Sequence, residues 1–130
     1  MKEQLSFYEQ KLRFELDSWD LAEGLSGKGK IIPIDTRSAE AFEDEHIPEA
    51  INIPHRTMSE NTTRHLDKAV LYVTYCNGIG CNGSTKGALN MVKLGFQVKE
   101  LIGGLDWWKR DGHETEGKKG SKRGVIVCSC

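Results

Sequence analysis

The segment that most constrains the fold runs from Val70 to Gly95, because it reads as a buried strand, a glycine-rich loop and a helix in direct succession. Residues 70–75 form an apolar run enriched in Val, Tyr and Thr, which is typical of a central strand. Cys76 falls where that strand should end. We expect Ser84 or Thr85 to cap the following helix through a side-chain oxygen.

This arrangement suits a nucleophilic thiol at Cys76. A loop that curls into a helix N-terminus directs backbone N–H groups inward, and these donors stabilise a thiolate, which is the reactive form of cysteine. The same donors can hold an anionic substrate or an oxyanion. A buried, inert core thiol is the alternative interpretation of Cys76. The residues expected to bind an anion are Asn77, Gly78, Ile79, Gly80, Asn82, Gly83, Ser84 and Thr85.

Composition favours one ordinary globular domain. The chain has 130 residues, 28% of them charged, and a net charge of −1, so no overall field attracts nucleic acid or an anionic membrane. No apolar run approaches the roughly 20 residues that span a bilayer, and the charged first residues lack a signal-peptide core. We therefore expect a cytoplasmic protein without cofactor or bound metal. Four cysteines in a reducing compartment are more often catalytic, metal-binding or free than paired in structural disulfides.

Helix and strand patterns alternate along the chain. Apolar residues at helical spacing predict an N-terminal helix with a core-facing stripe, followed by a second short helix from Asp17 or Ser18 to Leu25. The stripe consists of Leu5, Tyr8, Leu12, Leu16 and Trp19.

Further strands and helices follow in alternation. Strands are predicted at Ile31–Asp35, Ala50–Ile53 and Gln97–Leu101, and Pro33 places the first of them at a sheet edge or beside a local break. Short helices are predicted after Ser38 and at residues 105–110. The alternation predicts an α/β fold with a central, mostly parallel sheet and helices on both faces. Ligands bind beyond the carboxyl ends of such strands, which is where Cys76 lies.

We assign residues 1–117 to a single domain with an N-terminal helical extension, and residues 118–130 to a flexible tail. The tail is rich in glycine and charge, and its basic residues are expected to be solvated rather than to bind nucleic acid. Its last residues, 125–130, are expected to add an edge strand or to hang free. Cys128 and Cys130 are interpreted as exposed tail thiols.

Three ordered stretches resemble the rhodanese-like (sulfurtransferase) family. Asp35-Thr36-Arg37 and residues 46–54 (HIPEAINIP) are similar to its first signature, D-x-R followed by G-H-I-P-G-A-x-N-I-P. Tyr75-Cys76 is similar to its active-site segment. Residues 94–96 (LGF) and 101–108 (LIGGLDWW) are similar to its closing signature. Each piece is weak alone, but the ordered set over residues 18–113 is specific.

The resemblance implies a parallel sheet flanked by helices and an enzyme that moves sulfane sulfur. Cys76 would take the sulfur from a small donor such as thiosulfate, forming a persulfide, and a thiol, cyanide or protein acceptor would remove it. Asp35, Arg37 and His46 match positions that are usually structural in the family. We expect Arg37 to pair with a carboxylate and His46 to brace its turn.

The sequence departs from the family pattern at several places. The loop from Cys76 to the helix is longer than in most of the family's sulfurtransferases, and it contains no Arg or Lys, which weakens the case for a thiosulfate dianion. Glu45 and Glu49 stand where glycines are usual. Cys81 is an extra thiol in the loop.

Cys81 has three interpretations. In the first, Cys81 attacks a Cys76 persulfide and leaves a disulfide, because a hairpin-like loop can bring the two Cα atoms within the roughly 4.4–6.8 Å that a disulfide needs. Otherwise it is the nucleophile itself, or a bystander.

The same residues bear on other functions of this kind of fold. A phosphatase of this fold needs an arginine at position 82, which is Asn82 here. Arsenate reduction and a non-enzymatic regulatory or persulfide-binding module stay open. A zinc site would combine Cys76 and Cys81 with Cys128 and Cys130, at a spacing unlike the usual pair of closely spaced cysteines.

Overall fold

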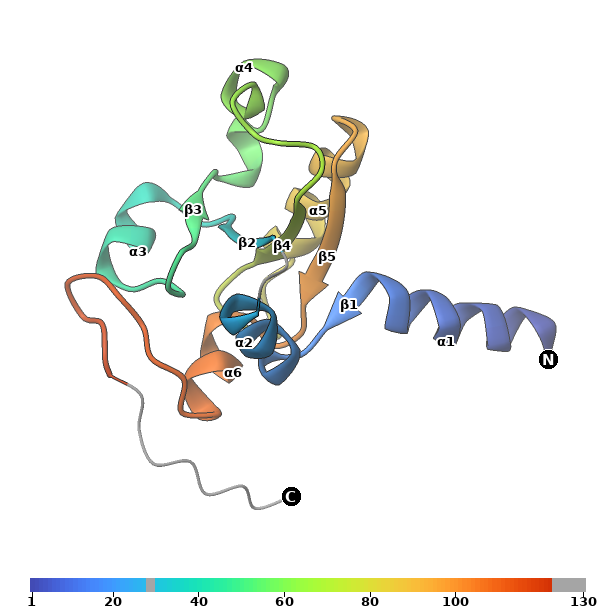
Figure 1. The fold of residues 1–130 in the computed structure, drawn as a ribbon, viewed down its shortest axis with the longest axis horizontal. Coiled ribbons are helices and arrows are strands. Elements are labelled where there is room, and N and C mark those ends of the chain that lie inside the picture. Colours follow the sequence, from blue (N-terminus) through green and yellow to red (C-terminus); the bar gives the residue numbers. More distant parts are fainter. Residues whose placement is uncertain (28–29, 123–130) are drawn as a thin grey trace.

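A computed structural model describes residues 1–27 and 30–122, which form a five-stranded sheet with helices around it (Figure 1). The strand order is β1-β5-β4-β2-β3, and every neighbouring pair is parallel, so the predicted α/β fold is confirmed. The strands are β1 (Glu15–Leu16), β2 (Ile31–Asp35), β3 (Ile51–Asn52), β4 (Leu71–Tyr75) and β5 (Gln97–Leu101). The helices are α1 (Lys2–Phe14), α2 (Ser18–Ser26), α3 (Ala39–Asp44), α4 (Glu60–Thr63), α5 (Gly83–Lys93) and α6 (Gly104–Arg110), with a 3-10 turn η1 at His55–Thr57.

Alternation along the central strand β4 separates two hydrophobic cores. Val73 and Tyr75 point toward α2 and α6, where they pack in one cluster with Leu21 and Trp108. Tyr72 points to the opposite face and packs in a second cluster, which includes Met91 of α5. Because side chains of a strand alternate between faces, both sides of the sheet are covered and β4 is buried between them.

Pro33 lies beside a local break in strand pairing, which is one of the two positions that the sequence predicted, and not at a sheet edge. It lies in β2, between β4 and β3, with its ring buried and paired in register with Val73. The short strand β3 pairs with β2 only at Ile34 and Asp35. No strand therefore lies beside Pro33 on that side, and the backbone N–H that proline lacks is not needed for pairing there. A proline is therefore tolerated in an interior strand.

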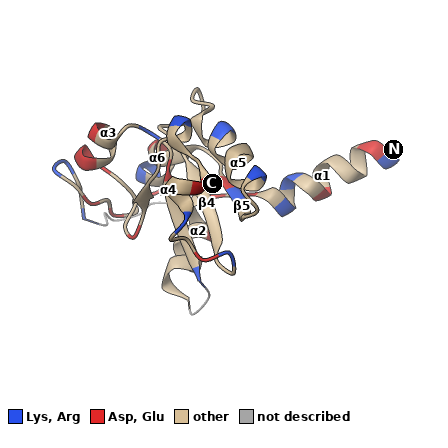
Figure 2. Ribbon diagram, turned by 90° about the horizontal axis from the view of Figure 1, so that it is seen from above, with Lys and Arg blue, Asp and Glu red and all other residues tan. Residues whose placement is uncertain are grey.

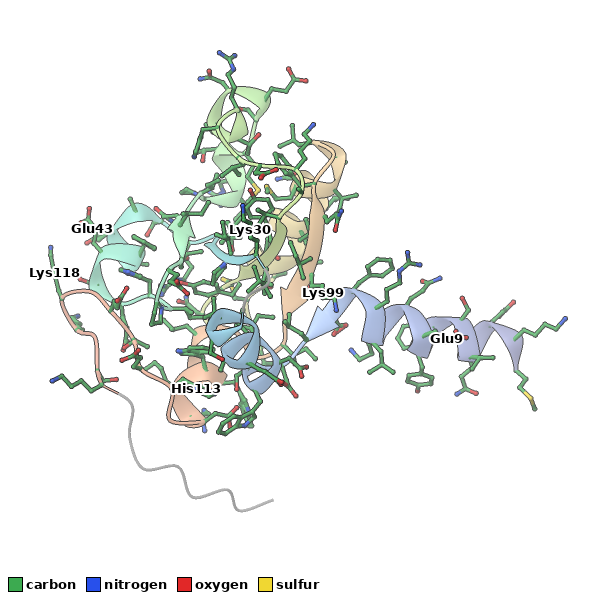
Figure 3. The ribbon with its side chains drawn as sticks, viewed as in Figure 1. Glu9, Lys30, Glu43, Lys99, His113 and Lys118 are labelled. Carbon is green, nitrogen blue, oxygen red and sulfur yellow. A yellow bond between two sulfur atoms is a disulfide. The ribbon has the colours of Figure 1, made fainter. Side chains whose placement is uncertain are left out.

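The prediction that the apolar stripe of the N-terminal helix faces the core is wrong. Helix α1 has no buried residue, and Leu5, Tyr8 and Leu12 are 62%, 53% and 81% exposed. Figure 1 shows α1 projecting away from the sheet, and in Figure 3 the side chain of Glu9 on this helix lies clear of the domain. Of the predicted stripe, Leu16 is buried, and it belongs to β1 rather than to the helix.

The start of the predicted tail is hydrogen-bonded to the domain. The N–H groups of Lys118 and Lys119 donate to the carbonyls of Glu43 and Asp44, and the N–H of Ser121 donates to Thr115 Oγ1. The prediction for residues 123–130, which include Cys128 and Cys130, lies outside the described residues. None of the helices among residues 1–27 and 30–122 is long and apolar enough to cross a membrane.

Candidate active site

The backbone at Cys76 is held firmly at the carboxyl end of β4. The carbonyl of Cys76 accepts from the N–H of Leu105 at 2.9 Å, and the carbonyl of Asn77 accepts from that of Asp106 at 2.8 Å. A Cβ on Gly104 would lie 2.4 Å from the Cys76 carbonyl oxygen, so the N-terminus of α6 approaches this backbone as closely as only glycine permits. Cys76 itself is 4% exposed.

Cys76 and Cys81 form a disulfide, with Cα atoms 6.1 Å apart. The loop thus brings the two thiols together as the hairpin-like geometry predicted. Both sulfurs lie against the first residue of α5, because a Cβ on Gly83 would be 3.1 Å from Cys76 Sγ and 3.4 Å from Cys81 Sγ.

The helix after the loop is not capped as the sequence predicted. Asn82 occupies the N-cap position of α5 without a side-chain hydrogen bond. The hydroxyls of Ser84 and Thr85 instead donate to one carboxylate oxygen of Glu100, at 2.7 and 2.5 Å. No side chain therefore caps the N-terminus of α5 where the two sulfurs lie.

Glu100 is not among the residues that the sequence predicted for the site. It stands near the end of β5, which neighbours β4, so its carboxylate reaches the same edge of the sheet as Cys76. Ligands bind beyond the carboxyl ends of parallel strands, and this rule, which points to Cys76, also points to Glu100.

A cavity of about 540 Å³ opens beside the loop. Its lining comes from the loop, from the ends of α1 and β5 and from the start of α6. Cys81 belongs to this lining, whereas Cys76 does not. The charged side chains that line it are Lys11, Glu15 and Glu100, and Lys11 is paired with Glu15 at 2.9 Å. Among residues 1–27 and 30–122, Glu100 has no ion-pair partner, so an anion entering from this side meets a carboxylate rather than a free cation.

Asp35 and Arg37 form a buried brace next to the loop. Asp35 accepts from the backbone N–H, Nε and Nη2 of Arg37 and from the hydroxyl of Tyr75. Tyr75 Oη in turn accepts from the N–H of Ile47. Burial and the neighbouring Asp35 charge raise the pKa of Tyr75. Burial alone would lower the pKa of Arg37, but the hydrogen bond and charge of Asp35 raise it overall.

This brace also touches the loop. Arg37 Nη1 donates to Asn77 Oδ1 at 3.0 Å, so a cation that is distant in sequence reaches the first loop residue. Since the rest of the guanidinium is bound to Asp35 and to the Glu45 carbonyl, Arg37 orients the loop rather than offering a free charge.

His46 lies outside the sulfur site. Its Nδ1 is 2.6 Å from the carbonyl of Phe42, and its ring stacks on the Phe42 ring with centroids 3.8 Å apart. Glu49 has a φ of 69°, a left-handed conformation that favours glycine, which explains why a glycine is usual at this position. Glu45 ends α3 with an extended backbone and does not need this left-handed conformation.

The described residues contain no group of three or more His, Cys, Asp or Glu that could hold a metal ion. The hypothetical zinc site needed Cys128 and Cys130, which lie outside the described residues.

Comparison with known proteins gives consistent matches. Residues 18–111 match the rhodanese-like domain. The thiosulfate sulfurtransferase GlpE of Coxiella burnetii is 32% identical over 96 residues, which are 72% of this chain and 82% of that protein. Its counterpart in Pseudomonas savastanoi pv. phaseolicola is 28% identical over 90 residues, or 68% and 80% of the two chains.

Solved structures extend the match to nearly the whole chain. The BH2092 protein of Bacillus halodurans is 42% identical with a TM-score of 0.87, covering 98% of this chain and 94% of that one. The rhodanese-like domain of the Anabaena sp. Alr3790 protein is 25% identical with a TM-score of 0.72, covering 89% and 92%.

Proposed function

Because this chain belongs to the rhodanese-like domain family, we propose that it is a sulfurtransferase in which Cys76 carries sulfane sulfur as a persulfide. The observation that carries the proposal is the position of Cys76, at the end of the central strand β4 and against the uncapped N-terminus of α5. Backbone N–H groups and the helix dipole there stabilise a thiolate or persulfide anion.

The anion-binding surface is the loop backbone of residues 77–85. The loop contains no charged residue, so its N–H groups are the donors available to an anionic sulfur. Asp35, Arg37 and His46 hold the surrounding turns in place. Sulfur transfer needs no cofactor in this scheme, and a reactive thiol of this kind requires a reducing compartment, which favours the cytoplasm.

The donor class follows from the charges at the cavity. Relatives of this chain are named thiosulfate sulfurtransferases. In the described part of the chain, Glu100 is the charged group of the cavity lining without an ion-pair partner, and its negative charge repels a dianion more than a monoanion. We propose a sulfane donor of lower charge than thiosulfate, with a thiol, a protein thiol or cyanide as acceptor.

Sulfur loading tests the assignment of the carrier. Reduced wild type, Cys76→Ser and Cys81→Ser would be incubated with thiosulfate or with benzenethiosulfonate, a monoanionic sulfane donor, and weighed by intact mass spectrometry without reductant. One added sulfur in Cys81→Ser and none in Cys76→Ser is expected. The reverse pattern would make Cys81 the carrier, and no added sulfur in any folded form would overturn the proposal.

Donor preference is tested with Glu100→Gln, which keeps an oxygen that accepts from Ser84 and Thr85. Removing this charge should speed loading from thiosulfate by about three- to tenfold at low ionic strength. Loading from benzenethiosulfonate should change less. Equal acceleration of both donors would contradict an effect of charge.

A second candidate is a module that binds a persulfide without turning it over. The observation in its favour is the low exposure of Cys76, which leaves its sulfur outside the cavity lining. Multiple turnovers with cyanide as acceptor, measured as thiocyanate, support the enzyme. Loading once without turnover for any acceptor supports the module.

A further inference from the structure

We propose that Cys81 resolves the Cys76 persulfide, so that the protein reduces sulfane sulfur to hydrosulfide and is regenerated by an external dithiol. This inference rests on the proposed role of Cys76 as sulfur carrier. The Cys76–Cys81 disulfide is the product that such a reaction leaves behind.

The chain around the pair is built for contact between the two sulfurs. The Cα atoms lie 6.1 Å apart across a separation of five residues, within the range that a disulfide requires. The N–H of Cys81 donates to the carbonyl of Gly78 at 3.1 Å, which turns the loop back toward β4. A side chain at position 83 would contact both sulfurs, so the absence of one at Gly83 makes room for the disulfide.

The two cysteines differ in how firmly they are held. Cys76 is buried, and its carbonyl is fixed by α6. Cys81 is partly exposed on a turn with open surroundings, since a Cβ on Gly80 would meet nothing within 4 Å and Ile79 is 80% exposed. Cys81 is therefore the thiol that can swing aside to admit a donor and return afterwards, while Cys76 stays in place.

The chemistry balances without another reactant in the resolving step. The Cys81 thiol loses its proton and attacks Cys76 Sγ, forming the Sγ–Sγ bond. The bond between Cys76 Sγ and the terminal sulfur breaks, and that sulfur leaves with the electron pair and the proton as hydrosulfide. The sulfane sulfur is reduced by two electrons, and the two cysteine sulfurs are oxidised by one electron each.

Regeneration needs an external dithiol, and the geometry indicates where it attacks. Cys81 lines the cavity and Cys76 does not, so the incoming thiolate reaches Cys81 Sγ. The leaving group is then the Cys76 thiolate at the N-terminus of α5, and a stabilised thiolate leaves faster. The second thiol of the partner resolves the mixed disulfide and releases Cys81.

A single-turnover experiment tests the inference in the full chain carrying Cys128→Ser and Cys130→Ser, which leaves Cys76 and Cys81 as the remaining thiols. The chain is reduced, freed of reductant and given one equivalent of benzenethiosulfonate. One hydrosulfide per chain is expected, together with a mass lower by two hydrogens. The matched Cys81→Ser chain should hold its added sulfur and release none until a thiol is supplied.

The outcomes separate the two proposals. If Cys81→Ser takes up sulfur and the chain with both thiols keeps the persulfide without forming a disulfide, the resolving role is overturned and the carrier role stands. If Cys81→Ser takes up no sulfur while its circular dichroism spectrum is unchanged, the carrier role of Cys76 is overturned, and the resolving role of Cys81, which depends on it, is overturned as well. Glutathione added to the oxidised chain should be found on Cys81, and recovery of glutathione on Cys76 would contradict the proposed direction of attack.

Discussion

Helices α5 and α1 both carry apolar residues at helical spacing, yet only α5 is covered. Helix α5 buries Gly83, Ser84, Gly87 and Met91 against the sheet. Helix α1 is longer and buries no residue. Figure 2 shows both Lys or Arg and Asp or Glu along α1, which is the charge mixture of a solvated helix. Helical periodicity in the sequence therefore identifies an apolar stripe but does not show which surface, if any, covers it.

The largest expected effect is at Met91, in the middle of the covered face of α5. Met91 is fully buried in the cluster with Ile34, Tyr72 and Phe96. Met91→Ala should lower the free energy of unfolding by about 2–4 kcal/mol, because it leaves a cavity in a packed core. Urea unfolding followed by circular dichroism measures this, and a loss below that range would mean that the face of α5 is loosely packed.

A smaller loss is expected where α5 packs against Thr36, the residue that follows β2. A Cβ on Gly87 would lie 2.5 Å from Cγ2 of Thr36, which is buried and donates its hydroxyl to the Tyr75 carbonyl. Gly87→Ala should therefore cost about 1–3 kcal/mol, although alanine favours helices. A stabilised variant in the same unfolding assay would show that Thr36 moves aside freely.

The comparison extends to charged groups. Glu45 of the packed domain accepts from Lys109 at 2.8 Å and Thr115 at 2.6 Å. Partial burial raises its pKa, but these two hydrogen bonds outweigh burial and lower the pKa overall. Its ionised form therefore stabilises the fold above the unfolded pKa, and that stability is lost as the pH falls through the folded pKa.

Glu45→Gln tests this linkage. The variant should be less stable than wild type by about 1 kcal/mol at pH 7, and the difference should shrink as the pH falls below the ordinary range of a glutamate. Glu15→Gln, at the end of α1, serves as the control, since its partner Lys11 is half exposed and such pairs contribute little. A difference for Glu45→Gln that is constant from pH 7 to pH 3 would contradict the linkage.

The smallest effect is expected on α1. Leu12 is 81% exposed, so Leu12→Ala should change the free energy of unfolding by no more than about 0.5 kcal/mol. A loss above 1 kcal/mol that grows with protein concentration would break the comparison, because α1 would then be covered in solution.

The part of the fold that sequence predicted well is the part with local signals. Residues 70–95 combine a β-branched apolar run, a cluster of glycines and a helical pattern, so strand, loop and helix were expected in the right order. Asp17 or Ser18 was predicted to start the second helix, and Asp17 caps α2 by accepting from the backbone N–H of Asp20. Cys76 falls at the strand end for the same local reason.

The errors arise where distant residues decide the outcome. The sequence left Pro33 open between a sheet edge and a local break, and the choice depends on β3, which pairs with β2 without reaching Pro33. Ser84 and Thr85 were expected to cap α5, but Glu100, from the neighbouring strand, accepts their hydrogen bonds. Arg37 reaches Asn77 across 40 residues of chain. Contacts of this kind depend on strand order, which the local pattern does not specify.

The disulfide between Cys76 and Cys81 also affects how the protein responds to oxidation by peroxide. A thiolate reactive enough to accept sulfur is open to peroxide, and a lone cysteine can proceed from sulfenic acid to irreversible sulfinic and sulfonic acids. A thiol at disulfide distance intercepts the sulfenic acid and releases water, and the buried Cys76 sulfur is then shielded from further attack. If Cys76 carries sulfur as proposed, its oxidation by peroxide would thereby end in a disulfide, which a dithiol of lower reduction potential can reduce.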